Sequence, residues 1–518
     1  MEPNILRRTI ITITVILCSI MELIDTSIIN VAVNEISGNL GATITETSWV
    51  ISAYGIANVI VVPMAGWLSL QFGRKNYFTF SVVLFTIASA FCGLSSGIWE
   101  LVFFRFLQGV GGGALLATSQ TILLEAYPKK LIGLANALFG MGIILGPTLG
   151  PTLGGYIVDN LSWRWIFYVN LPVGVIATAL VIAFIKDSVH ETKGSNARVD
   201  WLGIILLVIG IGSLQFVLEK GQEEDWFSSK LIIGFTISAV VGIISFIIRE
   251  LYAKYPIVNI RVLYNRTLAT GVLLSFMLGF VLFASVFIYP LLVQRFFGFT
   301  ATITGLTLLP GALLSGLMMP FVGMALSKGL SPKLLVPFGF FFLSIFCYLC
   351  CRHISPTSGS DAFFTPLLFR GLGLGLLFVP LTNLALGDLK GNDISQGAGI
   401  TSMMRQLGGA FSVAICSTYL NISSQQHRVQ LLQYITPENP QTVERLNNTI
   451  RNYQSKGYSL NIATNMAYKS IDFTIYKQAS YLAYMDAFLY LGVFCVICIP
   501  LIFIAKTNKP SDVIVSAH

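Results

Sequence analysis

Residues 104–109, Phe-Arg-Phe-Leu-Gln-Gly, open a glycine-rich apolar segment, and residues 369–374, Phe-Arg-Gly-Leu-Gly-Leu, open a second segment of similar sequence. If the two correspond, the chain contains two related halves, at about 9–185 and 269–505, with two further apolar segments inserted between them. Parallel halves of six helices that rock around a site at the membrane midplane are a transporter architecture. The repeat therefore predicts an arrangement of six, two and six transmembrane helices.

Composition places the chain in a bilayer. Its 518 residues are 54% hydrophobic and only 11% charged, and the mean hydropathy is +0.75. Soluble domains carry about 25% charged residues, so polar surface is too scarce to cover a globule of this length. The same figures exclude a disordered chain, a fibrous repeat and a secreted disulfide scaffold. We expect an all-α integral membrane protein.

Apolar segments can be counted along the chain. A spanning helix needs about 20 apolar residues, and fourteen segments approach that length: 9–33, 47–70, 77–95, 98–123, 132–158, 165–185, 201–219, 231–249, 269–291, 302–326, 333–351, 363–387, 397–420 and 482–505. An even number places both termini on one side of the membrane.

Basic residues between these segments predict which side that is. With the N-terminus in the cytoplasm, the inner segments hold eighteen: Arg7, Arg8, Arg74, Lys75, Lys129, Lys130, Lys186, Lys193, Arg198, Arg249, Lys254, Arg261, Arg266, Lys328, Lys333, Lys390, Lys506 and Lys509. The short outer loops hold five: Arg164, Lys220, Lys230, Arg295 and Arg352. Because Lys and Arg accumulate in cytoplasmic loops, we expect both termini in the cytoplasm.

Three stretches are too polar to span the membrane. Residues 186–200 form a linker, 250–268 form a basic, partly amphipathic segment expected along the inner interface, and about 421–481 form a long outer loop with helical spacing from Thr442 to Tyr453. A loop of that length is more often a docking or gating element than padding. The predicted domains are a six-helix bundle over 1–185, a linker with two inserted helices over 186–268, and a second bundle over 269–518 that includes the long loop.

Two residue types argue against an enzyme. Seven of the eight cysteines lie inside apolar runs and the eighth ends one, so we interpret them as small buried hydrophobic residues despite two Cys-x-x-Cys spacings. The four histidines, His190, His353, His427 and His518, lie outside the centres of the spanning segments. We find no metal cluster, nucleophile–base pair or phosphate loop, and we expect no cofactor, with protons as the coupling ion.

Five charges remain inside the apolar segments: Glu22, Asp25, Arg105, Arg370 and Arg405. Each costs about 2.5–3.5 kcal/mol at the centre of a membrane helix, so each is a candidate functional residue. Glu22 and Asp25 are three residues apart and share one helical face. Two neighbouring carboxylates in a low-dielectric region favour proton binding, which predicts a proton-coupling pair; the alternative is that Glu22 pairs with an arginine and never titrates.

The three arginines cannot lose their proton. Arg105 can stabilise a carboxylate when a conformational change brings the two together, or it can serve only as a clamp on backbone carbonyls. Arg370 and Arg405 can bind an anionic substrate group or hold the C-terminal half together.

Glycine spacing marks one segment for close packing. Glycines recur at positions 142, 146, 150 and 154, with Gly155 beside the last, and Pro147 and Pro151 are interleaved with them. Such spacing makes a smooth face for helix approach, and prolines bend a helix. Together they predict a hinge in a moving bundle.

These features resemble the major facilitator superfamily over nearly the whole chain. The stretch from Gly66 to Gly73, Arg74 and Lys75 looks like the superfamily's cytoplasmic loop motif. Leu70 and Gln71 stand where that motif has an acid and an arginine, so its charge-relay latch is incomplete. Residues 105–113 look like the arginine-containing motif linked to proton transfer, and Gly146, Gly150, Pro151, Gly154 and Gly155 look like the fifth-helix motif of drug:proton exchangers.

Further stretches resemble the 14-helix drug:proton antiporters and, within them, EmrB-type multidrug exporters. They are Leu23 to Ala32, which contains Asp25 and Asn30, Ser162 to Pro172, and Gly210 to Gln215 with Asp225 to Ser229. The resemblance implies proton-coupling roles for Asp25, Glu22 and Arg105, and it makes Asn30, Gln108, Arg370 and Arg405 candidates for substrate binding or gating.

The resemblance implies a proton-coupled antiporter of the bacterial inner membrane that exports amphiphilic drugs or toxic compounds. In that family the antiporter works with a periplasmic membrane-fusion adaptor and a TolC-like outer-membrane channel. The alternatives are a dedicated exporter of an endogenous fatty acid, siderophore or lipid-like metabolite, and a proton-coupled uptake symporter. We expect no nucleic-acid partner.

Overall fold

The computed structural model describes residues 5–128, 131–186, 199–387, 389 and 392–502, and the regular structure among them is entirely helical. Most of the predicted linker 186–200 lies outside the described residues. So do seven basic residues of the topology prediction: Lys129, Lys130, Lys193, Arg198, Lys390, Lys506 and Lys509.

The N-terminal part contains six candidate membrane spans, by helix length and apolar composition. Its helices are α1 (Ile5–Leu40), α2 (Ile44–Phe72), α3 (Arg74–Leu94), α4 (Ile98–Ala126), α5 (Ile132–Asn160), α6 (Trp165–Tyr168) and α7 (Asn170–Phe184). Together α6 and α7 make one crossing of 20 residues. We call the end of the bundle where α1 begins the N-terminal face, and the opposite end the distal face.

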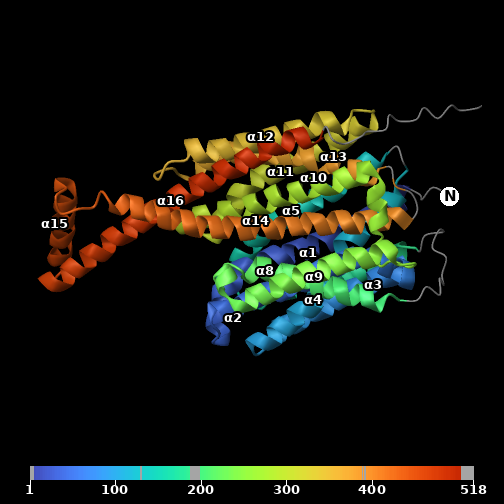
Figure 1. Ribbon diagram of the computed structural model, residues 1–518, viewed down its shortest axis with the longest axis horizontal. Coiled ribbons are helices and arrows are strands. Elements are labelled where there is room, and N and C mark those ends of the chain that lie inside the picture. The colour runs from blue at the N-terminus through green and yellow to red at the C-terminus, as the bar shows by residue number, and fades with distance from the viewer. Residues whose placement is uncertain (1–4, 129–130, 187–198, 388, 390–391, 503–518) are drawn as a thin grey trace, which may run out of the picture.

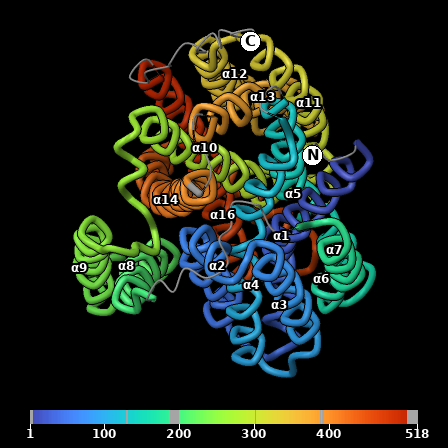
Figure 2. The backbone as a smooth tube through the Cα atoms, turned by 90° about the vertical axis from the view of Figure 1, so that its right-hand side faces the viewer, coloured from blue at the N-terminus to red at the C-terminus, as the bar shows by residue number. Residues whose placement is uncertain are grey.

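Two inserted helices follow, α8 (Trp201–Lys220) and α9 (Lys230–Tyr252), joined through the short helix η2 (Trp226–Ser228). They pack against each other and stand together at the edge of the bundle, near α2 and α14 (Figure 2). Much of α9 faces outward, because apolar side chains such as Val241 and Ile244 are more than half exposed. An outward apolar face of this kind suits contact with lipid.

The C-terminal part contains α10 (Arg266–Leu291) with a π-helical turn (Leu292–Phe296), α11 (Ala301–Ser327), α12 (Pro332–His353), α13 (Phe364–Leu386), α14 (Asn392–Leu432), α15 (Pro440–Ser455) and α16 (Leu460–Leu501). Every one of the fourteen predicted segments coincides with a helix. The all-α membrane fold predicted from the sequence is therefore confirmed.

The count of fourteen spans is not confirmed. Thirteen helices of the described chain are long and apolar enough to cross a membrane. The remaining long helix is α14, which coincides with the predicted segment 397–420. It carries buried polar residues, including Gln396, Arg405 and Ser412, because it packs against α2, α10 and α16. Because α14 packs against these helices, its sequence can be less apolar than that of a helix that faces lipid.

The stretch 421–481 is not the loop that the sequence predicts. α14 continues to Leu432 and α16 begins at Leu460, so both helices project beyond the rest of the distal face, and α15 lies across their ends (Figure 1). The two long helices are joined by an ion pair from Arg428 to Asp472 at 2.6 Å and by a hydrogen bond between His427 Nε2 and Asp486 Oδ2 at 2.7 Å. We call residues 421–481 the helical extension. Its predicted helical spacing at 442–453 falls within α15.

The predicted interfacial segment 250–268 runs from the last residues of α9 to the first residues of α10. Between them, residues 253–259 are irregular and Ile260–Tyr264 form a short 3₁₀ helix, η3. The segment is held from both sides: the backbone N–H of Val258 donates to Glu250 Oε2 at 3.2 Å, and that of Asn259 donates to Gln396 Oε1 of α14 at 3.2 Å. These bonds attach the connection between α9 and α10 to the N-terminal face of the bundle.

Short polar side chains fix several helix ends. Thr43 and Glu46 form a capping box at the start of α2, where the N–H of Glu46 donates to Thr43 Oγ1 at 3.2 Å and the N–H of Thr43 donates to Glu46 Oε2 at 2.8 Å. Asn265 caps α10 by accepting the N–H of Thr267 at 3.0 Å. A cap of this kind contributes about 1 kcal/mol.

The two halves are in close contact at two helix pairs, α5 with α11 and α2 with α14, where a glycine of one helix lies against the backbone of the other. A methyl group built on Gly133 of α5 would lie 2.5 Å from the carbonyl oxygen of Gly323 of α11. One built on Gly66 of α2 would lie 3.0 Å from the carbonyl oxygen of Ser395 of α14. Both contacts are near the N-terminal face, so the two halves meet closely there. The predicted division at 185 and 268 itself stays a prediction.

Candidate functional site

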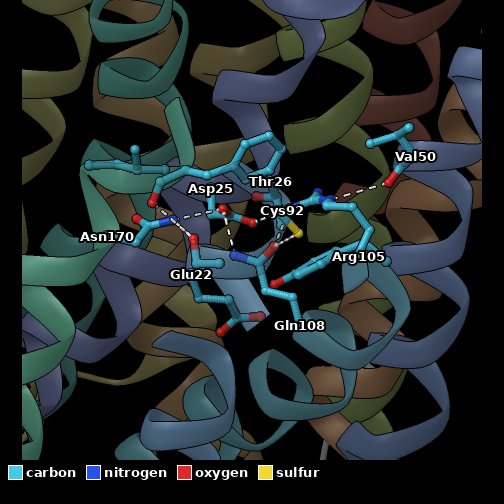
Figure 3. A network of polar contacts seen from close by, with 12 residues as sticks. Glu22, Asp25, Thr26, Val50, Cys92, Arg105, Gln108 and Asn170 are labelled. Atoms are coloured by element: carbon cyan, nitrogen blue, oxygen red, sulfur yellow. Dashed lines mark hydrogen bonds and ion pairs between the residues drawn. The ribbon is translucent and has the colours of Figure 1, made fainter. Parts of the chain in front are cut away.

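Asp25 lies in the middle of α1 and its side chain is fully buried. Its carboxylate accepts hydrogen bonds from Arg105 Nη1 at 2.5 Å, Gln108 Nε2 at 2.9 Å and Asn170 Nδ2 at 2.8 Å. The donors come from α4 and α7, so three helices converge on one carboxylate (Figure 3). All three partners are N–H donors, which fits the ionised form of the carboxylate.

Arg105 is 1% exposed and contacts both a carboxylate and a backbone carbonyl, the two alternatives predicted for it from the sequence. Besides the ion pair with Asp25, its Nε donates to the backbone carbonyl of Val50 at 3.2 Å. The guanidinium also stands over the ring of Tyr54, 4.4 Å from its centroid. Removing one partner from a buried ion pair costs about 3–5 kcal/mol, because the other charge is left uncompensated. The pair therefore fastens α4 to α1 and α2.

A second layer orients the amides around Asp25. Gln108 Oε1 accepts from Arg105 Nη1 at 2.9 Å and faces the thiol of Cys92 at 3.7 Å, which leaves Gln108 Nε2 for Asp25. Asn170 Nδ2 also donates to Ser89 Oγ at 3.1 Å. Figure 3 shows the side chains of Arg105, Gln108 and Asn170 pointing toward Asp25. A network in which most groups are satisfied holds the carboxylate in one position.

Glu22 lies one turn before Asp25, is 1% exposed and belongs to a separate network. Its Oε1 accepts from Asn58 Nδ2 of α2 at 2.9 Å, and its buried Oε2 has no partner in the described chain. Asn58 Oδ1 in turn accepts from Gln406 Nε2 of α14 at 2.8 Å. Glu22 is thus linked through one amide to the C-terminal half.

Arg405 and Arg370 do not join the Asp25 network. Arg405, next to Gln406, is buried, its guanidinium stands 5.2 Å from the ring centroid of Phe378, and its charge acts on Glu22 without a direct ion pair in the described residues. Arg370 is 2% exposed, and its Nε donates to Ser285 Oγ of α10 at 3.0 Å. No carboxylate pairs with Arg370 among the residues that the structure describes.

The glycine motif of α5 lies against α1. A methyl group on Gly146 would lie 2.5 Å from Leu23 Cβ, one on Gly150 would overlap Ser27, and one on Gly154 would lie 2.6 Å from Val31 Cγ2. Pro147, Pro151 and Gly155 lie in the same helix, which continues through both prolines. The motif therefore lets α5 approach the part of α1 that carries Asp25. The hinge stays a prediction.

The loop motif closes the turn between α2 and α3. Gly73 has a φ of 81°, a left-handed conformation that favours glycine. Arg74 forms an ion pair with Glu125 at the end of α4, and Lys75 Nζ donates to the carbonyl oxygen of Ile182 at 2.6 Å. Both basic residues thus tie this turn to neighbouring helices at the N-terminal face.

Gln108, predicted from the sequence as a candidate for substrate binding or gating, lies beside Asp25, and that role stays a prediction. Asn58, Asn170 and Gln406 were not predicted as site residues from the sequence. A signal was present, because each is an amide inside an apolar or membrane-embedded segment. Asn30, in contrast, is exposed and lies apart from the network. Its role in substrate binding or gating stays a prediction.

Two sets of membrane helices are linked by the hydrogen bond between Asn58 of α2 and Gln406 of α14. This fold, together with the family match, indicates a membrane transporter rather than an enzyme. Residues 15–413 match the sequence model of the Major Facilitator Superfamily, and the chain belongs to this family. It is a multi-pass protein of the bacterial inner membrane.

Known proteins support this assignment. The "Multidrug export protein EmrB" of Escherichia coli (strain K12) is 35% identical over 431 residues, which cover 83% of this chain and 84% of that protein. The "Fatty acid resistance protein FarB" of Neisseria gonorrhoeae is 33% identical over 497 residues, 96% of each chain. Among solved structures, the proton:xylose symporter XylE superposes with a TM-score of 0.59 at 14% identity, covering 95% of this chain and 96% of that one. That last likeness concerns the fold alone.

Proposed function

We propose that this chain is a proton-coupled antiporter that exports amphiphilic drugs or toxic compounds by alternating access. The observation that carries the proposal is the fully buried ion pair of Asp25 with Arg105, at 2.5 Å. A proton can bind Asp25 in this environment only when the ion pair opens, so proton binding requires movement of α4 relative to α1. The export of drugs is supported by the names of the relatives described above.

The second carboxylate extends this coupling to the other half. Glu22 has one buried oxygen without a donor, where a proton would bind, and its other oxygen is linked through Asn58 to Gln406 of α14. Protonation of Glu22 and Asp25 would therefore change contacts both within the N-terminal half and between the halves. One elementary charge falling through 100 mV supplies about 2.3 kcal/mol, enough to bias such a transition.

The proposal includes an orientation and partners. The excess of Lys and Arg predicts that the N-terminal face is cytoplasmic, which places the helical extension in the periplasm. There it would contact a periplasmic membrane-fusion adaptor that leads to a TolC-like channel of the outer membrane. A projecting surface of packed helices suits such docking better than a loop would.

The test is Asp25→Asn in proteoliposomes with an imposed proton gradient. An amide cannot carry a proton through the cycle, so we expect drug transport driven by the gradient to fall to the level of empty liposomes. Monodisperse elution of the purified variant shows that it folds, and Asp159→Asn, at an exposed position of α5, is the matched control. Transport by Asp25→Asn at the wild-type rate would refute the coupling assignment.

A second candidate is a dedicated exporter of an endogenous fatty acid, siderophore or lipid-like metabolite. One relative is named a fatty acid resistance protein, and the buried Arg370 without a carboxylate partner in the described chain would suit an acidic group. Metabolite profiling of a deletion strain separates the two functions. Accumulation of one acidic lipid-like compound, with unchanged drug sensitivity, would favour the dedicated exporter.

A further inference from the structure

A half-buried carboxylate, one oxygen of which is fully buried, lies between the inserted helix α8 and the first turns of α2. Glu219, near the distal end of α8, accepts a hydrogen bond from Gln215 Nε2 at 2.6 Å, and Ser52 of α2 faces the same carboxylate. Nearby, Trp49 of α2 packs on Phe216 of α8 with ring centroids 5.6 Å apart. Neither Glu219 nor its surroundings has a role in the proposed transport cycle.

The site contains more acceptors than donors. Glu219 Oε2 and Gln215 Oε1 are both buried, and neither has a hydrogen-bond partner in the described structure. A buried acceptor without a donor costs about 1–3 kcal/mol, and more when it is charged. One proton on Glu219 removes the charge and turns one of these oxygens into a donor. A bound proton is therefore the simplest occupant that completes the site.

The basic residue beside Glu219 does not neutralise it. Lys220 is 3% exposed, and its ammonium donates to Ser48 of α2 and to Glu223 at 2.8 Å. It also stands 5.1 Å from the ring centroid of Trp49. Lys220 and Glu223 are the charged groups that act on Glu219, with opposite signs. Lys220 forms its ion pair with Glu223 and not with Glu219. The carboxylate of Glu219 therefore has no ion-pair partner in Lys220.

The backbone of α2 is shaped for this carboxylate. A methyl group on Gly55 would lie 2.5 Å from Glu219 Oε1 and 3.6 Å from Gln215 Nε2. A side chain at this position would displace the carboxyl group of Glu219 from the surface of α2. The same helix α2 packs on α14 through Gly66 and Ser395, so it contacts both the inserted pair and the C-terminal half.

We propose that Glu219 is a proton-binding residue of the inserted helix pair, protonated while α2 packs against α8 and deprotonated when α2 moves away. The proton leaves to, or arrives from, the distal face, near which the carboxyl group lies. The movement of α2 rests on the proposed alternating access, whereas the bound proton rests only on the contacts around Glu219. The inserted helices thereby take part in proton exchange rather than only filling the membrane.

The bound proton can be tested without transport. Dicyclohexylcarbodiimide modifies protonated carboxyl groups in apolar surroundings, and the full chain in lipid nanodiscs is treated with it at pH 7.5. An ordinary exposed glutamate, with a pKa of about 4.3, is protonated to less than about 0.1% at that pH. We expect an adduct on Glu219, located by mass spectrometry, that E219Q removes and E224Q, at an exposed position of the same connection, retains. No adduct on Glu219 in the wild type overturns the proposal.

The coupling role is tested by counting protons. In proteoliposomes, E219Q mimics the protonated form permanently, so we expect drug transport to continue with fewer protons moved per drug molecule than in the wild type, and E224Q to match the wild type. An unchanged ratio in E219Q overturns the exchange of this proton. Should the wild type move no protons at all, the proposed function fails, while the labelling result still decides whether Glu219 carries a proton.

Discussion

Arg105 and Arg370 show how one residue type serves two purposes in related halves. Both follow a phenylalanine in the repeated stretch, both are buried, and each has a cysteine of the preceding long helix, Cys92 or Cys350, among its electrostatic neighbours. Arg105 meets the carboxylate of Asp25, whereas Arg370 meets the hydroxyl of Ser285. The repeat predicts the arginines but not this difference. Of the two arginines of the repeat, Arg105 alone forms an ion pair among the described residues.

Ser285→Asp tests whether Arg370 lacks a counter-charge. A carboxylate at this position would face the guanidinium directly, and Ser285→Asn supplies a neutral side chain of the same size as the control. Bonds to charged partners contribute about 1.5–3 kcal/mol against about 0.5–1.5 kcal/mol for neutral ones. We expect the aspartate variant to unfold at a higher temperature than the asparagine variant in detergent. Equal melting temperatures would show that Arg370 is already neutralised.

The link from Glu22 to α14 can be cut at either of two amides. Asn58→Leu removes the donor to Glu22 and the contact with Gln406 together, while Gln406→Leu removes only the second. Leaving the buried carboxylate without its donor costs about 1–3 kcal/mol. We expect Asn58→Leu to lower both thermal stability and drug-driven proton release more than Gln406→Leu. Equal effects would mean that the bond to Glu22 contributes nothing measurable.

At the scale of elements, α5 packs closely on two neighbours. Gly146, Gly150 and Gly154 accommodate α1, while Gly133 approaches the backbone of α11. Glycine spacing in the sequence predicts a face for close approach, because period-four positions share one side of a helix. It does not tell which helix is approached, since that depends on rotation and placement in the bundle. α11 contacts α5 both at Gly133, before the motif, and at Thr152, within it, where a methyl group on Gly305 would overlap the threonine hydroxyl.

Gly133→Ala tests the junction between the halves at α5 and α11. The new methyl group would lie 2.5 Å from a backbone carbonyl oxygen, so one helix must shift. Gly142→Ala is the matched control in the same helix, because its methyl group would lie 3.3 Å from a movable side-chain carbon of Ile16. Overpacking costs about 1–3 kcal/mol. We expect a clear loss of thermal stability in Gly133→Ala only; similar losses in both would argue against a specific junction.

The whole molecule shows what the sequence could and could not predict. Hydropathy finds the helices because each must be apolar where it meets lipid. Hydropathy does not find the helices of the extension, because the extension is polar. Even so, small residues such as Ala463 and Ala467 are buried where its helices pack together. Residue partners are harder still: Asn170 and Asp25 are 145 residues apart, and Asn58 and Gln406 are 348 apart. Contacts between residues so far apart in the chain cannot be predicted from a local sequence pattern.

The helical extension makes the last prediction. Tyr468, Phe473 and Tyr476, in the part of α16 that belongs to the helical extension, are more than half exposed. Exposed aromatic residues often anchor protein interfaces, with losses of about 2 kcal/mol or more on truncation. If the extension docks an adaptor, replacing all three by glutamine should abolish drug resistance in cells while transport in proteoliposomes stays at the wild-type rate.

The matched control for this triple variant replaces Asn461 and Asn465, two exposed polar residues of the same stretch, by alanine. It should keep both resistance and transport, because it leaves the aromatic surface intact. Parallel losses of resistance and transport in the glutamine variant would instead mean that the extension supports the transport cycle itself. Unchanged resistance in that variant would remove these aromatic residues from any docking surface, because a partner held by them could not remain bound.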